Sequence, residues 1–221
     1  MEGSKKLNIS IFIAILFHLS GLIGMYTDAR PWFISMTPLT LLLMTGLILW
    51  NEKIIYRELI LFFGLCFSFG YLSELIGTST GLLFGEYAYG YAMGYLVLGV
   101  PLLIGVQWFV TVFSIGHTVL FSYRLVYGNG HRSILTNFLL IIVAAGLTTL
   151  FDFVLEPAAV SLGYWEWHPD GVIPLFNYIS WFFISGFLLV PFFMIEQISR
   201  HINYFSVILI FIQTIFFLLV S

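Results

Sequence analysis

The stretch from Ile134 to Leu155 reads ILTNFLLIIVAAGLTTLFDFVL, and it decides the fold class. It contains one ionisable side chain, Asp152, in a run that matches the about 20 apolar residues a bilayer-spanning helix needs. The whole chain has this character, because 60% of its 221 residues are hydrophobic and only 9% are charged. Soluble domains carry roughly a quarter charged residues. The composition therefore predicts an integral membrane protein with a single domain spanning residues 1–221.

Further segments of this kind predict an all-α polytopic membrane protein with seven transmembrane helices. The expected spans are Leu7–Tyr26, Phe33–Trp50, Leu59–Ile76, Tyr95–Tyr123, Ile134–Leu155, Phe176–Glu196 and Tyr204–Val220. Pro101 and Pro191 are expected to bend the fourth and sixth helices. The first segment lacks a small-residue cleavage site, so we expect a retained helix rather than a signal peptide.

The basic residues predict the orientation of these helices. Seven of the eight Lys and Arg residues fall on the side of the N-terminus, and only Arg30 falls on the other. Cytoplasmic loops carry the excess of positive charge. We therefore expect the N-terminus in the cytoplasm and the C-terminus outside, in a bacterial or archaeal cytoplasmic membrane. The outer connections 77–94 and 156–175 contain no Lys or Arg, and chemistry is expected at that face.

Several function classes are excluded by what the sequence lacks. A net charge of -3 gives no electrostatic footprint for nucleic acid. Cys66 is the only cysteine, so there is no internal disulfide and no cysteine metal site. Phosphate-loop, nucleophile-elbow and metal-helix motifs are absent from the sequence, and no lysine stands on the last helix for a retinal Schiff base. The sequence predicts no metal and no cofactor.

A weak internal repeat relates the third and fourth helices to the fifth and sixth. Trp108 follows Pro101 by seven residues, and Trp181 follows Pro174 by the same spacing. Both hairpins run outward and back in the same sense, so the repeat would be parallel, about an axis along the membrane normal. The alternative is that Pro starts helices and Trp lies at interfaces in any membrane protein.

Three carboxylates near the outer helix ends are candidate catalytic groups. Asp152 and Glu156 are four residues apart and share a helix face. In a low-dielectric site the two would not both ionise, so the pair offers an acid and a base together. Pro157 is expected to end or distort the helix just beyond them. Glu74, one turn after Tyr71, is expected to face Asp152 across the repeat axis, in a shared cavity that opens toward the outer leaflet. The alternative for Asp152 and Glu156 is that they lie at the lipid–water boundary and cap or pair within the loops. The alternative for Glu74 is a solvated helix end.

Aromatic residues surround these carboxylates in the sequence, including Trp108, Phe151, Tyr164, Trp165, Trp167 and Trp181. Aromatic faces stabilise cations, so such a cluster would suit a carbocation intermediate. The alternative is packing or an interfacial belt. Glu86 stands in a loop and is expected to serve recognition or loop ordering rather than acid catalysis.

Two segments together resemble the membrane carotenoid-biosynthesis family that includes the bisanhydrobacterioruberin and γ-carotene 1',2'-hydratases. The first, from Gly77 to Trp108, contains GTSTG, FGEYAY and GVPLLI. The second, from Asp152 to Trp181, contains DFVLEP, GYWEW and GVIPLFN. The chain departs from the family pattern with Glu156 in place of Asp, Gly105 in place of Pro and one extra residue near Ile173.

The resemblance implies a carotenoid hydratase that adds water across the terminal C1=C2 double bond of an acyclic end group, giving a tertiary alcohol. It implies a membrane-dissolved carotenoid and water as reactants, and no cofactor. We expect substrate contacts from Tyr71, Glu86, Tyr87, Trp108, Phe151, Tyr164, Trp165, Asn177 and Trp181.

An alkene has no lone pair, so a carboxylic acid must protonate it directly. Asp152 is the expected donor because it lies deeper in the membrane, and Glu156 is expected to orient the water. Two alternatives remain: an acid-initiated carotenoid cyclase or isomerase, and a non-catalytic transporter or lipid-binding protein.

Overall fold

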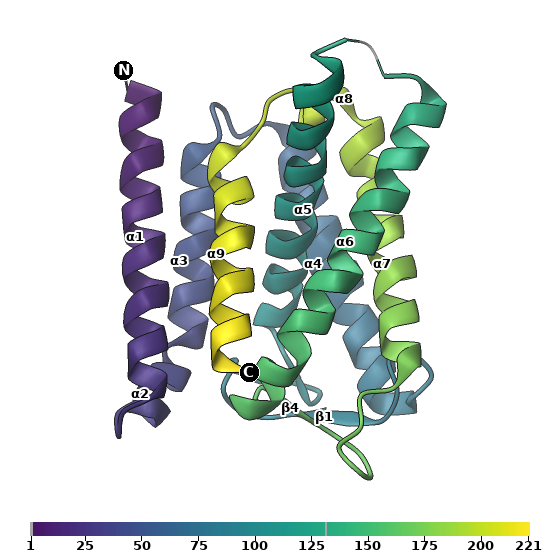
Figure 1. Ribbon diagram of the computed structural model, residues 1–221. Coiled ribbons are helices and arrows are strands. Elements are labelled where there is room, and N and C mark those ends of the chain that lie inside the picture. Colours follow the sequence, from purple (N-terminus) through teal and green to yellow (C-terminus); the bar gives the residue numbers. More distant parts are fainter. Residues whose placement is uncertain (1, 131) are drawn as a thin grey trace.

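The computed structural model describes residues 2–130 and 132–221, which form a bundle of helices running up and down along one axis (Figure 1). The helices are α1 (Glu2–Met25), α2 (Arg30–Ser35), α3 (Thr37–Asn51), α4 (Arg57–Thr80), α5 (Leu103–Tyr127), α6 (Ile134–Ser161), α7 (Leu175–Met194), α8 (Glu196–Ser199) and α9 (Tyr204–Val220). Five of them, α1, α4, α5, α6 and α7, are long and apolar enough to cross a membrane, while α3 and α9 are shorter apolar helices. The chain is thus a helical membrane protein.

Two of the expected spans begin differently in the structure. The segment 33–50 is divided at Met36 into α2 and α3, because Pro38 is accommodated only in the first turn of a new helix. Residues 96–101 form a hairpin of β2 (Leu96–Val97) and β3 (Val100–Pro101), in which Gly99 takes the positive φ of 82° that its turn requires. Pro101 therefore precedes α5 and does not bend it.

The ends of two later helices also correct the sequence expectations. Pro157 does not end α6, which continues to Ser161. Ala158 and Ala159 are fully buried there, and such packing lets a membrane helix tolerate a proline. The sixth expected span stops at Met194, since Glu196 begins the short helix α8.

Helix α5 lies at the centre of the bundle, and most of its residues are buried. Phe113 of α5 packs with Phe62 of α4 and Phe192 of α7, with ring centroids 6.4 and 6.1 Å away. Closer to the sheet end, Gly70 of α4 lies directly against the indole of Trp108, where a Cβ atom would overlap the ring. This close approach fixes the position of Trp108.

The two ends of the bundle differ. The N-terminus lies at one end, while the C-terminus and a two-stranded sheet lie at the other (Figure 1). The sheet pairs β1 (Tyr87–Tyr89) with β4 (Trp165–Trp167) in antiparallel register. The expectation of an all-helical chain omitted both this sheet and the β2–β3 hairpin. The β1–β4 sheet matters most, because it joins the loop after α4 to the loop after α6.

Candidate active site

The β1–β4 sheet turns four aromatic side chains toward the helices. Tyr87 stands opposite Trp167, and Tyr89 stands opposite Trp165. Alternate residues of a strand point to the same face, and the residue between the two aromatics of each strand is exposed. Each strand thus presents a pair of aromatic donors, two hydroxyls from β1 and two indole N–H groups from β4.

Glu74 near the end of α4 accepts hydrogen bonds from both tyrosines of β1. The hydroxyls of Tyr87 and Tyr89 donate to Oε2 over 2.5 and 2.8 Å, and Trp108 Nε1 donates to Oε1 over 3.0 Å. Glu74 is only 4% exposed. The alternative of a solvated helix end is therefore wrong, because this carboxylate is buried and held by three donors.

Glu156 of α6 has the matching arrangement with β4. Trp165 Nε1 and Trp167 Nε1 both donate to Oε2 over 2.9 Å, and Asn177 Nδ2 donates to Oε1 over 3.1 Å. Glu156 is 2% exposed. Each strand therefore holds one glutamate: β1 binds Glu74, and β4 binds Glu156.

Asp152 is linked to Glu156 through the amide of Asn177. The same Nδ2 atom that reaches Glu156 also donates to Asp152 Oδ2 over 2.8 Å. Asp152 Oδ1 is buried and has no hydrogen-bond partner among the described residues. A buried acceptor without a donor is costly, whereas two carboxyls that share one proton carry less buried charge. Asn177 thus joins the two carboxylates of α6 through one amide nitrogen.

A cavity of about 360 Å³ lies against the two glutamates. Glu74 and Glu156 both line it, whereas Asp152 is not among the lining residues. The expectation that Glu74 and Asp152 face one cavity is therefore corrected: the carboxylate that shares the cavity with Glu74 is Glu156. Asp152 lies one turn earlier on α6, where the Asn177 amide bridges it to Glu156.

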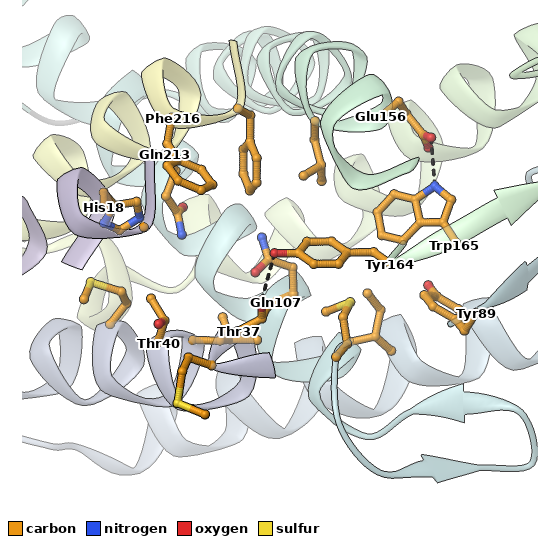
Figure 2. A pocket seen from close by; sticks show the side chains of 18 of the residues that line it. His18, Thr37, Thr40, Tyr89, Gln107, Glu156, Tyr164, Trp165, Gln213 and Phe216 are labelled. Atoms are coloured by element: carbon orange, nitrogen blue, oxygen red, sulfur yellow. Dashed lines mark hydrogen bonds between the residues drawn. The ribbon is translucent and has the colours of Figure 1, made fainter. Parts of the chain in front are cut away.

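Aromatic rings form much of the wall near the glutamates. Trp108 and Trp181 line the cavity and stack on each other, with centroids 4.2 Å apart. Trp165 and Tyr164 extend the wall, and the Tyr164 hydroxyl lies 3.0 Å from Thr37 Oγ1 (Figure 2). Of the expected substrate contacts, Tyr87, Trp108, Tyr164, Trp165, Asn177 and Trp181 line the cavity.

The three other expected contacts lie outside the cavity lining. The Tyr71 hydroxyl donates to the Val97 carbonyl over 2.7 Å and anchors the β2–β3 hairpin. Glu86 is exposed, and Phe151 packs on Phe217 with ring centroids 6.0 Å apart.

Tyr89 was missed as a site residue, and Trp167 was noted only as one of the surrounding aromatics. The signal was present in the spacing, because Tyr-Ala-Tyr and Trp-Glu-Trp are two-residue repeats typical of a strand with one buried face.

The tyrosines of β1 are suited to remain neutral donors. Burial raises the pKa of Tyr87, and the Glu74 carboxylate raises it further. The pKa of Tyr89 is raised by the same causes. Both phenols therefore keep their protons at physiological pH and can donate to Glu74.

The other end of the cavity lies between α1, α3 and α9. His18 of α1, Thr40 of α3, and Gln213 and Phe216 of α9 line it (Figure 2). His18 Nδ1 lies 2.8 Å from the Ala14 carbonyl of its own helix. Among residues 2–130 and 132–221, no three His, Cys, Asp or Glu side chains come together as a metal-binding group.

Fold and site together define a helical membrane protein with a mainly apolar cavity that two buried glutamates face. The chain belongs to the carotenoid biosynthesis protein family, which it matches over residues 33–221. It is also similar to bisanhydrobacterioruberin hydratase from Haloarcula japonica, with 34% identity over 122 residues. That match covers 55% of this chain but only 38% of the relative. No solved structure matches the chain significantly. The family resemblance seen in the sequence is confirmed.

Proposed function

We propose that this protein is a carotenoid hydratase that adds water across the terminal C1=C2 double bond of an acyclic carotenoid end group. The observation that carries the proposal is that Glu74 and Glu156 line one cavity whose wall also includes stacked tryptophans. Membership of the carotenoid biosynthesis family and the similarity to a hydratase support the choice of substrate and reaction.

The first step is transfer of one proton from the Asp152–Glu156 pair to C2 of the terminal alkene. The π electrons form the new C–H bond and leave a tertiary cation at C1. Glu156 would deliver the proton because it is the member of the pair that lines the cavity, and a general acid must lie within reach of the atom it protonates. Asp152 would act as a positioning and proton-sharing residue. From the sequence, Asp152 was expected to donate and Glu156 to orient the water; the proposal gives the donor role to Glu156 and the water step to Glu74.

The second step is capture of the cation by water. The oxygen of a water molecule bonds to C1 and loses a proton, which Glu74 accepts, giving the tertiary alcohol. Glu74 is suited to this role because it accepts three hydrogen bonds and lines the same cavity. The faces of Trp108 and Trp181 would stabilise the cation meanwhile. Proton exchange with water then restores the pair and Glu74, and no cofactor is needed.

We also propose that α4–α5 and α6–α7 are a parallel repeat, and that seven helices cross a bacterial or archaeal cytoplasmic membrane. The repeat is supported by the two strands that each bind one glutamate and by the stacking of Trp108 on Trp181. The orientation is supported by the basic residues at the N-terminal end, which the positive-inside rule assigns to the cytoplasm. The glutamates would then lie toward the outer leaflet.

Expression of the chain in a lycopene-producing host tests the reaction. The expected result is pigment that has gained the mass of one water for each modified end, as seen by mass spectrometry. The Glu74→Gln and Glu156→Gln proteins serve as controls and should leave lycopene unmodified.

An isomeric pigment of unchanged mass would instead identify a cyclase or isomerase. That is the second candidate, because the glutamate end of the cavity is buried and a cation there could lose a proton before water arrives. Unchanged lycopene would favour the transporter or lipid-binding alternative.

A further inference from the structure

The cavity is buried at the glutamate end, and its exposed lining residues lie away from the two glutamates. Glu74, Glu156, Trp108 and Trp181 are all buried. The exposed lining residues are Ser20 of α1, Trp32 of α2 and Leu39 of α3. The opening therefore lies between α1 and the α2–α3 segment, away from the glutamates.

The surface around this opening is apolar. Leu19 and Ile23 of α1, on either side of Ser20, are 52% and 60% exposed, and Leu42 of α3, just beyond Leu39, is 51% exposed. Exposed apolar side chains on membrane helices face acyl chains, because neither water nor another helix covers them. The opening is thus a lateral one that faces the bilayer.

Helix α1 forms one wall of this opening and is held against α9 and α3. Its His18 ring packs edge-on against Phe216 of α9 at 5.7 Å. At the far end of the bundle Asn51 Nδ2 of α3 donates to Ser10 Oγ of α1 over 2.7 Å. Residues 1–32 lie outside the stretch that matches the family, which begins at residue 33. The matched region thus supplies the glutamates, while α1 supplies the outer wall.

We infer that the opening between α1 and α3 is the entrance for a long apolar polyene, which reaches the cavity directly from the bilayer. One end group would lie at Glu74 and Glu156, while the rest of the chain leaves between α1 and α3 into the lipid. Ligand pockets measure about 300–1,000 Å³, and a cavity of about 360 Å³ holds one end of such a molecule rather than its whole length. The identity of the polyene as a carotenoid rests on the proposed function.

Two variants on α3 test the entrance. Leu39 and Leu42 are similarly exposed, 57% and 51%, but only Leu39 lines the cavity. Each is replaced by Trp, and the proteins are reconstituted in phosphatidylcholine vesicles. Uptake of lycopene from donor vesicles is followed as the lycopene absorbance that the repurified protein retains. Leu39→Trp is expected to slow uptake about tenfold, within the range over which association rates vary among related variants, and Leu42→Trp to leave it unchanged.

A second pair on α1 guards against a folding defect of one variant. Ser20 lines the cavity and Leu16, one turn earlier and also exposed, does not. Ser20→Trp should slow uptake and Leu16→Trp should not.

If lycopene uptake is equal for the two variants of each pair, the inferred entrance is wrong, even if the protein hydrates lycopene. Failure of the unaltered protein to take up lycopene, or a tightly retained phospholipid that lycopene does not displace, would also overturn it. Slowed uptake in Leu39→Trp and Ser20→Trp with no gain of water in the product would leave the entrance established and refute the hydratase instead.

Discussion

Trp108 and Trp181 stack nearly face to face, with ring centroids 4.2 Å apart and ring planes inclined by 20°. Each follows a proline by seven residues, Pro101 or Pro174, in its own half of the chain. Trp108 also donates its indole N–H to Glu74 over 3.0 Å. The stacked rings and this carboxylate therefore form one rigid wall of the cavity, with a π surface beside a fixed acceptor.

Removal of one indole face should slow the reaction. Trp181→Leu is expected to lower turnover about thirtyfold, because a cation–π contact in a desolvated site is worth about 2 kcal/mol. Trp181→Phe keeps an aromatic face and should retain most of the activity. Turnover is measured as hydrated carotenoid formed per amount of protein in membranes. Equal rates for the Leu and Phe variants would contradict the role of the ring in stabilising a cation.

The Asp152–Glu156 pair should depend on both members. Glu156→Gln is expected to abolish hydration, because it removes the carboxyl that lines the cavity. Asp152→Asn should lower turnover strongly while carotenoid binding persists, since it removes the partner that shares the proton. Product formation and retained lycopene are measured for both variants. An active Glu156→Gln protein beside an inactive Asp152→Asn protein would return the donor role to Asp152, as the sequence alone indicated.

The β1 tyrosines should position Glu74 rather than bind substrate. Tyr87→Phe and Tyr89→Phe each remove one donor to Glu74 Oε2. A hydrogen bond to a charged group is worth about 1.5–3 kcal/mol, so turnover should fall about tenfold or more for each variant while lycopene uptake is unchanged. Tyr71→Phe is the control, because its hydroxyl binds the Val97 carbonyl instead. A loss of uptake that matches the loss of turnover would point to a direct substrate contact.

The close approach of α4 to Trp108 should make Gly70 intolerant of a side chain. Gly70→Ala places a Cβ atom within the indole of Trp108, and overpacking of this kind costs about 1–3 kcal/mol. Gly64→Ala on the same helix meets nothing within 4 Å and should be neutral or stabilising by up to about 1 kcal/mol. Thermal unfolding in detergent compares the two. A Gly70→Ala protein as stable as Gly64→Ala would show that Trp108 can move aside.

Ionisation of Glu52, which follows the end of α3, should lower the stability of the folded protein as the pH rises. Burial raises the pKa of Glu52, and the hydrogen bond that Asn203 Nδ2 donates over 2.6 Å lowers it in part. Because the raised pKa means that the folded protein binds this proton more tightly than the unfolded chain, stability is lost as pH rises from the usual value of 4.5 through the raised one. Glu52→Gln should raise the melting temperature at pH 8 more than at pH 5. An equal effect at both pH values would contradict this.

Hydropathy and charge predicted the class of protein without the tertiary structure. The apolar run from Ile134 to Leu155 and its counterparts indicated a helical membrane protein because a bilayer requires such lengths. The ordered motifs from Gly77 to Trp108 and from Asp152 to Trp181 indicated the family, which the match over residues 33–221 confirms. The presence of Glu74, Asp152 and Glu156 near helix ends made them candidates, since ionisable groups at membrane depth tend to be functional.

The sequence by itself thus determined the membrane class, the approximate helices, the family and the set of carboxylates. Only the tertiary structure decided that Glu156 rather than Asp152 shares the cavity with Glu74, because two residues four apart on α6 differ only in which neighbours cover them. The strands β1 and β4 are three residues each and distant in the chain, so local propensity does not predict them. Their pairing, fixed by packing against the ends of α4 and α6, brings the hydroxyls and indoles to the two glutamates.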